Sequence, residues 1–205
     1  MQRSSTSFIT IRGVVFSALF AALMVVMSFV NIRLGVNPVP ITLENMVPML
    51  AGALLGPLYG FLSIFLVIFL TALGLPLMHG DAGIAFIIGP TGGFIWMFPI
   101  SALLTGLIVS RIRGSGPTAS IKIFLAIWLC ALTVYLTGVP WLAYRASFTL
   151  SEALAAGFTP FILIDTLKCV AATLIVLPIR RIFPMSRLTG ARDVQVADLR
   201  NDESI

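Results

Sequence analysis

The sequence predicts an all-α integral membrane protein: a bundle of six transmembrane helices, with a short or kinked second helix and both termini in the cytoplasm. Of the 205 residues, 59% are hydrophobic and 10% are charged, whereas about a quarter of a soluble domain is charged. The hydrophobic residues form long continuous runs without the two-residue alternation of a transmembrane β-strand. Charged residues lie between these runs, and they indicate where each predicted helix ends.

The first run, 13–32, has 20 uncharged residues between Arg12 and Arg33, which is enough for one crossing. A cleaved signal peptide is the alternative. However, the run is longer than a typical signal-peptide core and ends without a clear small-residue cleavage site. We therefore predict a retained helix that follows a short cytoplasmic N-terminus, 1–12.

The next run, 45–80, has 36 uncharged residues. As one helix it would be about 54 Å long, far more than a bilayer core of about 30 Å, so it must fold back. Gly56 and Pro57 mark the expected break, because proline disfavours helical backbone in the residue before it and can begin a helix. The predicted spans are then 42–55, which is short for a crossing, and 58–75.

Three further spans are predicted in the second half of the chain. Glycine and proline interrupt the next apolar run at 89–93, so the fourth helix is expected at 92–110. The fifth is expected at 123–139 and the sixth at 160–179. The remaining segment, 180–205, is polar with mixed charges, which is typical of a solvated cytoplasmic tail.

In this prediction the membrane domain, 13–179, crosses an even number of times, so both termini lie on one side. If that side is the cytoplasm, it holds every Lys and Arg of the chain except Arg33 and Arg145, outside, and Lys168, within a span. The positive-inside rule favours that orientation. The net charge of +5 therefore reflects topology and does not indicate nucleic-acid binding, because the basic residues form no single stripe.

One acid and one base lie well inside a predicted span: Asp165 and Lys168, in the outer half of the sixth helix. Ionisable side chains in a bilayer are costly, and they usually pair with each other or with a substrate. Residues three apart share a helix face, so both can act on one ligand; an internal salt bridge is the alternative. A glycine-rich loop, 77–93, is expected at the same depth, where its backbone can approach a small molecule or simply turn between helices.

Six short motifs occur in order through the membrane part of the chain. They are PVPITL (38–43), LAGALLGP (50–57), GLP (74–76), GPTGGF (89–94), GVPWL (138–142) and DTLK (165–168). In this order and spacing they resemble the BioY family, the biotin-specific substrate-binding (S) components of energy-coupling factor (ECF) transporters. The chain departs from the family pattern at Glu44 and Asn45, where Gln-Thr is frequent, and at Leu163 and Ile164, where Pro-Gly is frequent.

The resemblance implies high-affinity capture of biotin at the outer face of the bacterial inner (cell) membrane and its release inward. The implied partners are a transmembrane coupling subunit and two ATPase subunits. The implied substrate-binding residues are Asp165, Lys168, Asp81, Gly89, Thr91, Gly92 and Trp141. Asp165 is expected to accept the ureido N–H bonds, and Lys168 to bind either the ureido carbonyl or the carboxylate. His79 and Asp81 are the candidates for a further polar loop contact.

Small residues repeat every four positions on the first helix, a spacing that lets helices approach closely in lipid. One series is Gly13, Ser17 and Ala21, and the other is Ala18 and Ala22. The spacing alone allows packing inside the bundle or docking of a partner. The resemblance implies that Ala18 and Ala22 contact the coupling subunit.

Other classes of protein are disfavoured. Neither lysine of the chain, Lys122 or Lys168, follows a glycine, so the chain has no P-loop and is not itself a P-loop ATPase. An intramembrane hydrolase needs paired acids, a nucleophile with its base or metal ligands, and the one histidine, His79, lies in a loop. We expect no enzyme activity, no cofactor and no metal. An S component for another small vitamin and a solitary biotin facilitator stay open as alternatives.

Overall fold

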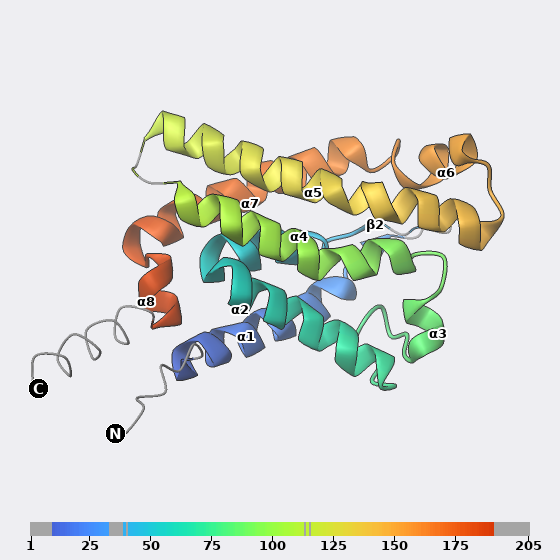
Figure 1. Cartoon of the computed structure of the whole chain (residues 1–205), viewed down its shortest axis with the longest axis horizontal. Coiled ribbons are helices and arrows are strands. Elements are labelled where there is room, and N and C mark those ends of the chain that lie inside the picture. The colour runs from blue at the N-terminus through green and yellow to red at the C-terminus, as the bar shows by residue number, and fades with distance from the viewer. Residues whose placement is uncertain (1–9, 33–38, 40, 113, 115, 191–205) are drawn as a thin grey trace, which may run out of the picture.

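The computed structural model describes residues 10–32, 39, 41–112, 114 and 116–190. Their secondary structure is almost entirely helical (Figure 1). In chain order the elements are α1 (Ile11–Ser28), β1 (Asn31–Ile32), β2 (Ile41–Thr42), α2 (Met46–Ala72), α3 (Ile84–Ile87), α4 (Gly92–Arg111), α5 (Pro117–Ala146), α6 (Leu150–Gly157), α7 (Ile162–Ile182) and α8 (Met185–Thr189).

Within the described residues, five helices are long and apolar enough to cross a membrane: α1, α2, α4, α5 and α7. The prediction had six spans. The difference lies in α2, which covers most of both ranges predicted as the second and third spans, 42–55 and 58–75. The helical character of the membrane protein is therefore confirmed, whereas the number of crossings depends on how α2 is counted.

A break inside α2 lies where the proline signal indicated. Gly56 has φ 83° and ψ −175°, which is not helical, and glycine adopts such a positive φ without strain. In a continuous helix Gly52 and Gly60 would lie about 12 Å apart. A Cβ atom built on Gly60 would instead lie 2.9 Å from the Cα of Gly52. The two halves of α2 thus fold back on each other as a tight hairpin.

Other helix ends differ from the predicted ones for identifiable reasons. α5 extends beyond 123–139 in both directions. At its start the helix includes the charged Lys122 in exposed first turns, and at its end it continues through Pro140. The range predicted as a polar tail contains α8, which packs against α1 and α2. Residues 191–205 of that tail, and 1–9 of the predicted N-terminus, lie outside the described residues.

Two helix starts have side-chain caps. Thr10 Oγ1 accepts the Gly13 N–H at 3.1 Å and caps α1. Thr149 and Glu152 form a capping box at the start of α6, which was not predicted. Each cap satisfies backbone N–H groups that the first helical turn leaves without partners.

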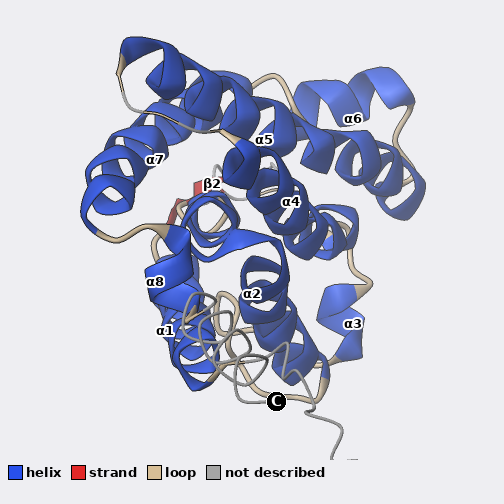
Figure 2. Ribbon diagram, turned by 60° about the vertical axis from the view of Figure 1, so that its left-hand side comes forward, coloured by secondary structure: helices blue, strands red, loops and turns tan. Residues whose placement is uncertain are grey.

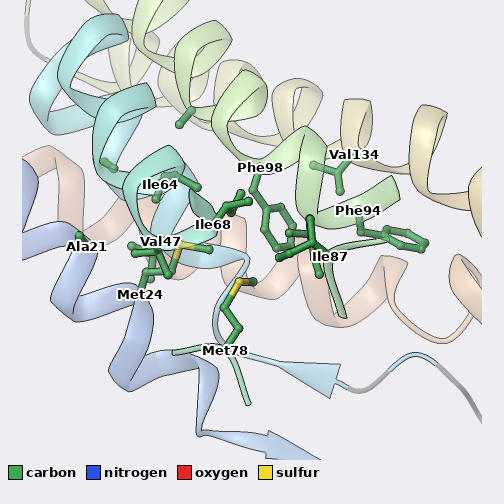
Figure 3. Packing of buried hydrophobic residues seen from close by; sticks show 14 of the residues in the cluster. Ala21, Met24, Val47, Ile64, Ile68, Met78, Ile87, Phe94, Phe98 and Val134 are labelled. Carbon is green, nitrogen blue, oxygen red and sulfur yellow. The ribbon is translucent and has the colours of Figure 1, made fainter. Parts of the chain in front are cut away.

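The core consists of two clusters of buried apolar side chains. The first joins α1, α2, α4 and α5 with the connection between α2 and α4, where Met78 and Ile87 are fully buried (Figure 3). The second joins α2, α5 and α7 around Ile127 and Cys169. Figure 2 shows the short strand β2 beside α7 in the middle of the molecule. β2 pairs antiparallel with β1, with Asn31 opposite Thr42 and Ile32 opposite Ile41.

Gly106 allows α4 to cross the break in α2 closely. A Cβ atom on Gly106 would lie 2.4 Å from the backbone N of Pro57 and 2.5 Å from the carbonyl C of Gly56. Gly106→Ala is therefore expected to lower the free energy of unfolding by about 1–3 kcal/mol, because backbone atoms at a hairpin cannot move aside easily. Thermal unfolding in detergent measures this. Ser110→Ala, exposed on the same helix, is the control, and an unchanged melting temperature for Gly106→Ala would contradict the packing.

Candidate functional site

The two charged residues predicted inside a span lie together in the first turns of α7. Asp165 and Lys168 are 7% and 6% exposed. Their side chains face each other, with Lys168 Nζ 2.8 Å from Asp165 Oδ1. The position of Asp165 near the helix N-terminus also favours its negative charge. The pair is therefore an inward-facing ion pair, as residues three apart on one helix face can form.

The remaining polar atoms of this pair are satisfied by other elements. Lys168 Nζ also donates to the backbone O of Thr42, at 2.6 Å, and to Oδ1 of Asn45, at 2.9 Å. These acceptors and Asp165 use all three ammonium protons. The hydroxyl of Tyr135, on α5, donates to Asp165 Oδ2. Such a buried ion pair is stable because further hydrogen bonds compensate its desolvation.

The ion pair lines a cavity between α2, α4, α5 and α7. The cavity has an empty volume of about 570 Å³, which includes solvent space at its mouth. The polar groups on its wall are those of the hydrogen-bonded network and Ser101, and aromatic rings of Phe94, Phe98 and Phe161 form part of the rest. An apolar cavity with a few converging polar groups is the usual form of a small-molecule site.

Tyr135 is held in place by ring contacts. Its ring meets those of Phe94 and Phe158 edge to face, with centroids 6.1 Å and 5.0 Å apart. This arrangement is favourable for aromatic pairs. It fixes the hydroxyl toward Asp165, so that the carboxylate is presented to the cavity in one orientation.

The glycine-rich loop, 77–93, lies beside the cavity, and none of its residues lines the cavity. Trp141 Nε1 donates to the backbone O of Gly89 at 2.9 Å. Cβ atoms on Gly92 and Gly93 would lie 3.1 Å from Trp141 Nε1 and 2.3 Å from Trp141 Cβ. Thr91 is the N-cap residue of α4. These residues dock the start of α4 against α5, and this docking places Phe94 on the cavity wall.

The two loop candidates occupy different places. Asp81 is exposed, in a turn where its N–H donates to the backbone O of Met78 at 2.8 Å. His79 points to Glu44, with Nε2 2.9 Å from Oε2. Neither residue lines the cavity.

Tyr135 and Asn45 are cavity residues that the sequence interpretation missed. Asn45 did carry a signal, since it differs from the family pattern. Tyr135 carried a weaker one, as a hydroxyl in the middle of an apolar span. Thr42 contributes only a backbone carbonyl, which no side-chain pattern can indicate.

The two small-residue series on α1 face different surroundings. Gly13, Ser17 and Ala21 are buried, and Ser17 Oγ donates to the backbone O of Tyr59 at 3.3 Å. Ala18 and Ala22 are exposed. The first series therefore packs inside the bundle, and the second is available on the outer surface.

Chemically, the site offers a carboxylate acceptor and an ammonium donor side by side at an apolar cavity. Such a site suits a small molecule with N–H donors, an acceptor oxygen and an apolar body. In the described residues there is no cluster of three or more His, Cys, Asp or Glu that could hold a metal ion. A helical membrane protein with this cavity belongs to the class of membrane solute-binding proteins.

Comparison with known proteins defines the family, and the chain belongs to the BioY family, whose model matches residues 1–185. It is 40% identical over 159 residues to a probable biotin transporter BioY of Pyrococcus horikoshii, a match of 77% of this chain and 90% of the relative. It is 36% identical over 172 residues to the biotin transporter BioY of Rhizobium etli, with 80% and 90% coverage. The family resemblance in the sequence is thus confirmed.

A solved structure has the same fold. The crystal structure of the S-component for biotin from an ECF-type ABC transporter aligns with a TM-score of 0.78 and 29% sequence identity. The alignment covers 83% of this chain and 92% of that structure. The arrangement of membrane helices described above is therefore that of an S component.

Proposed function

We propose that the chain binds biotin in the cavity at Asp165 and Lys168 and takes part in its uptake. The buried ion pair at an apolar cavity is the observation that carries this proposal, together with membership of the BioY family. Biotin has two ureido N–H donors beside a carbonyl oxygen, an apolar bicycle and chain, and a carboxylate. Asp165 suits the ureido N–H donors, Lys168 suits one of the biotin oxygens, and the aromatic rings suit the apolar part.

The hydrogen bonds within the site suggest how biotin is accommodated. A carboxylate has about four lone-pair sites, so Asp165 can accept the ureido N–H groups while it keeps its bonds to Tyr135 and Lys168. All three protons of Lys168 have protein acceptors. A biotin oxygen therefore replaces one of them, and the backbone carbonyl of Thr42 and the amide of Asn45 are the replaceable ones.

Six crossings with both termini in the cytoplasm fit the contacts of the chain ends. Thr10, just before α1, donates through Oγ1 to the backbone O of Thr189, at the end of α8. This contact supports a topology in which both ends of the described chain lie on one side, with an even number of crossings. The hairpin at Gly56 supplies the sixth crossing. Arg111, Lys122 and Arg180 are then on the cytoplasmic side, which supports the orientation through the positive-inside rule.

Biotin would be delivered inward with an ECF module of a transmembrane coupling subunit and two ATPase subunits in the bacterial inner membrane. The exposed series at Ala18 and Ala22 is the proposed contact for the coupling subunit. It is flanked by exposed apolar side chains of α1, including Val14 and Val26, which are 51% and 61% exposed. A small-residue seam between such side chains lets another membrane helix approach closely.

Uptake of labelled biotin by bacterial cells that lack their own biotin transporter tests this function. Cells with the chain, the coupling subunit and the ATPase subunits are expected to accumulate biotin above cells without the chain. Accumulation without the other subunits would favour a solitary facilitator. Selective accumulation of another vitamin would favour a different ligand, and the absence of any accumulation would refute the proposal.

A further inference from the structure

A second buried acid lies next to the cavity without lining it. Glu44 is 1% exposed. Its Oε2 lies 2.9 Å from Nε2 of His79, whose side chain is 10% exposed. The other carboxylate oxygen, Oε1, is buried and has no hydrogen-bond partner among the described residues, and His79 Nε2 approaches Oε2 as an ion-pair contact without a well-aligned hydrogen bond. His79 is therefore the main compensation for a buried carboxylate, and a buried charge without a partner is strongly unfavourable.

Glu44 lies in the same short segment as two acceptors of Lys168. The backbone O of Thr42 and Oδ1 of Asn45 both accept from Lys168 Nζ. Segment 42–45 is thus held on one side by Lys168, at the cavity, and on the other by His79. The contact between Glu44 and His79 is thus only one or two residues along the chain from the acceptors of the ammonium group.

His79 is itself fixed in an uncommon conformation. Its φ of 58° lies in the left-handed region, which non-glycine residues seldom adopt. Its N–H donates to Ser28 Oγ at 3.3 Å, and that hydroxyl donates to the backbone O of Leu77 at 3.0 Å. The His79 ring also meets Phe86 edge to face, with centroids 6.1 Å apart. The end of α1 and the connection after α2 therefore hold the imidazole rigidly toward Glu44.

We propose that Glu44 and His79 are a positioning pair: their contact fixes segment 42–45 and thereby sets the orientation of Lys168 toward the ligand. This inference rests on the proposed binding of biotin at Lys168. Neither residue touches the ligand. Their effect on affinity passes through the acceptors at Thr42 and Asn45.

Two substitutions of His79 separate this role from simple backbone strain. Asparagine tolerates the left-handed conformation well but is too short to reach Glu44. Glutamine tolerates it less well, yet its longer side chain can donate an amide N–H to Glu44. A positioning role predicts that His79→Gln binds biotin more tightly than His79→Asn. A role in backbone conformation alone predicts the opposite order.

The measurement is the biotin dissociation constant of the purified chain in detergent. His79→Asn is expected to weaken binding by about tenfold, within the range for residues coupled through one network, and His79→Gln by about twofold. Glu44→Gln keeps an acceptor for His79 and should also stay within about twofold. Glu152→Gln, an exposed acid whose side chain bonds Thr149, is the control and should bind like the unaltered chain.

The Lys168→Met background shows whether the effect passes through Lys168. In the Lys168→Met background, His79→Asn and His79→Gln are expected to bind biotin with equal affinity. Equal affinities of the two variants in the unaltered background, tighter binding by His79→Asn, or a difference that persists without Lys168 would each overturn the positioning role. Failure of the unaltered chain to bind biotin would instead refute the proposed function.

Discussion

Replacing Lys168 with methionine or Asp165 with asparagine should weaken biotin binding by about 10- to 150-fold for each substitution. Each change removes one charge-assisted hydrogen bond to the ligand, which contributes about 1.5–3 kcal/mol. Each also leaves the other member of a buried pair without its partner, since both side chains are less than a tenth exposed. Without ligand, the free energy of unfolding of each single variant is therefore expected to be about 3–5 kcal/mol lower. Each variant should accordingly unfold at a lower temperature.

The double variant Asp165→Asn with Lys168→Met separates ligand binding from a purely structural salt bridge. It contains no unpaired buried charge, so its unfolding temperature should recover above that of either single variant. Its biotin affinity should stay low, because both ligand contacts are absent. Calorimetric titration and thermal unfolding on the same preparations measure the two quantities. Recovery of affinity together with stability would show that the pair is only structural.

Ala18→Trp is expected to abolish biotin uptake by the assembled transporter and to leave biotin binding by the isolated chain unchanged. Ala18 is exposed on α1 and lies away from the cavity residues. An indole there prevents the close approach of a partner helix along the series with Ala22. Labelled-biotin uptake in cells and binding by the purified variant are measured in parallel.

Two matched variants control for this substitution. Leu129→Trp places an indole at another lipid-facing position, on α5, where the leucine is 54% exposed, and it should leave uptake intact. Ala21→Trp fills a buried position of α1, where the alanine is 7% exposed, and it should disrupt folding and binding together. Normal uptake by Ala18→Trp, or loss of its biotin binding, would contradict the proposed docking surface.

Much of the helical arrangement could be predicted because lipid imposes a simple rule: charges collect at the ends of apolar runs. The break at Gly56 was also predictable, since the run was too long for one crossing and contained a single Gly-Pro step. The extension of α5 past Pro140 was not, because neighbouring helices in a membrane bundle tolerate proline inside a helix. α6 and α8 were missed because short helices outside the apolar runs leave no hydropathy signal.

The site was predictable only in part. Asp165 and Lys168 stand out because ionisable residues are rare inside a span. The glycine-rich motif also stood out, and the structure gives two of its residues a packing role: Gly92 and Gly93 are small where Trp141 docks. Glu44 and His79 are 35 positions apart, with Glu44 at the start of the predicted span 42–55 and His79 in the glycine-rich loop. Only the folded chain brings them together behind the cavity.

Equilibrium binding of labelled biotin to the purified, detergent-solubilised chain tests the central claim most directly. The chain alone should bind biotin saturably at one site, and unlabelled biotin, but not thiamine or riboflavin, should displace the label. The cavity and its ion pair belong to this single chain, so we expect binding without any other subunit. The absence of saturable binding, or equal displacement by the other vitamins, would contradict the account.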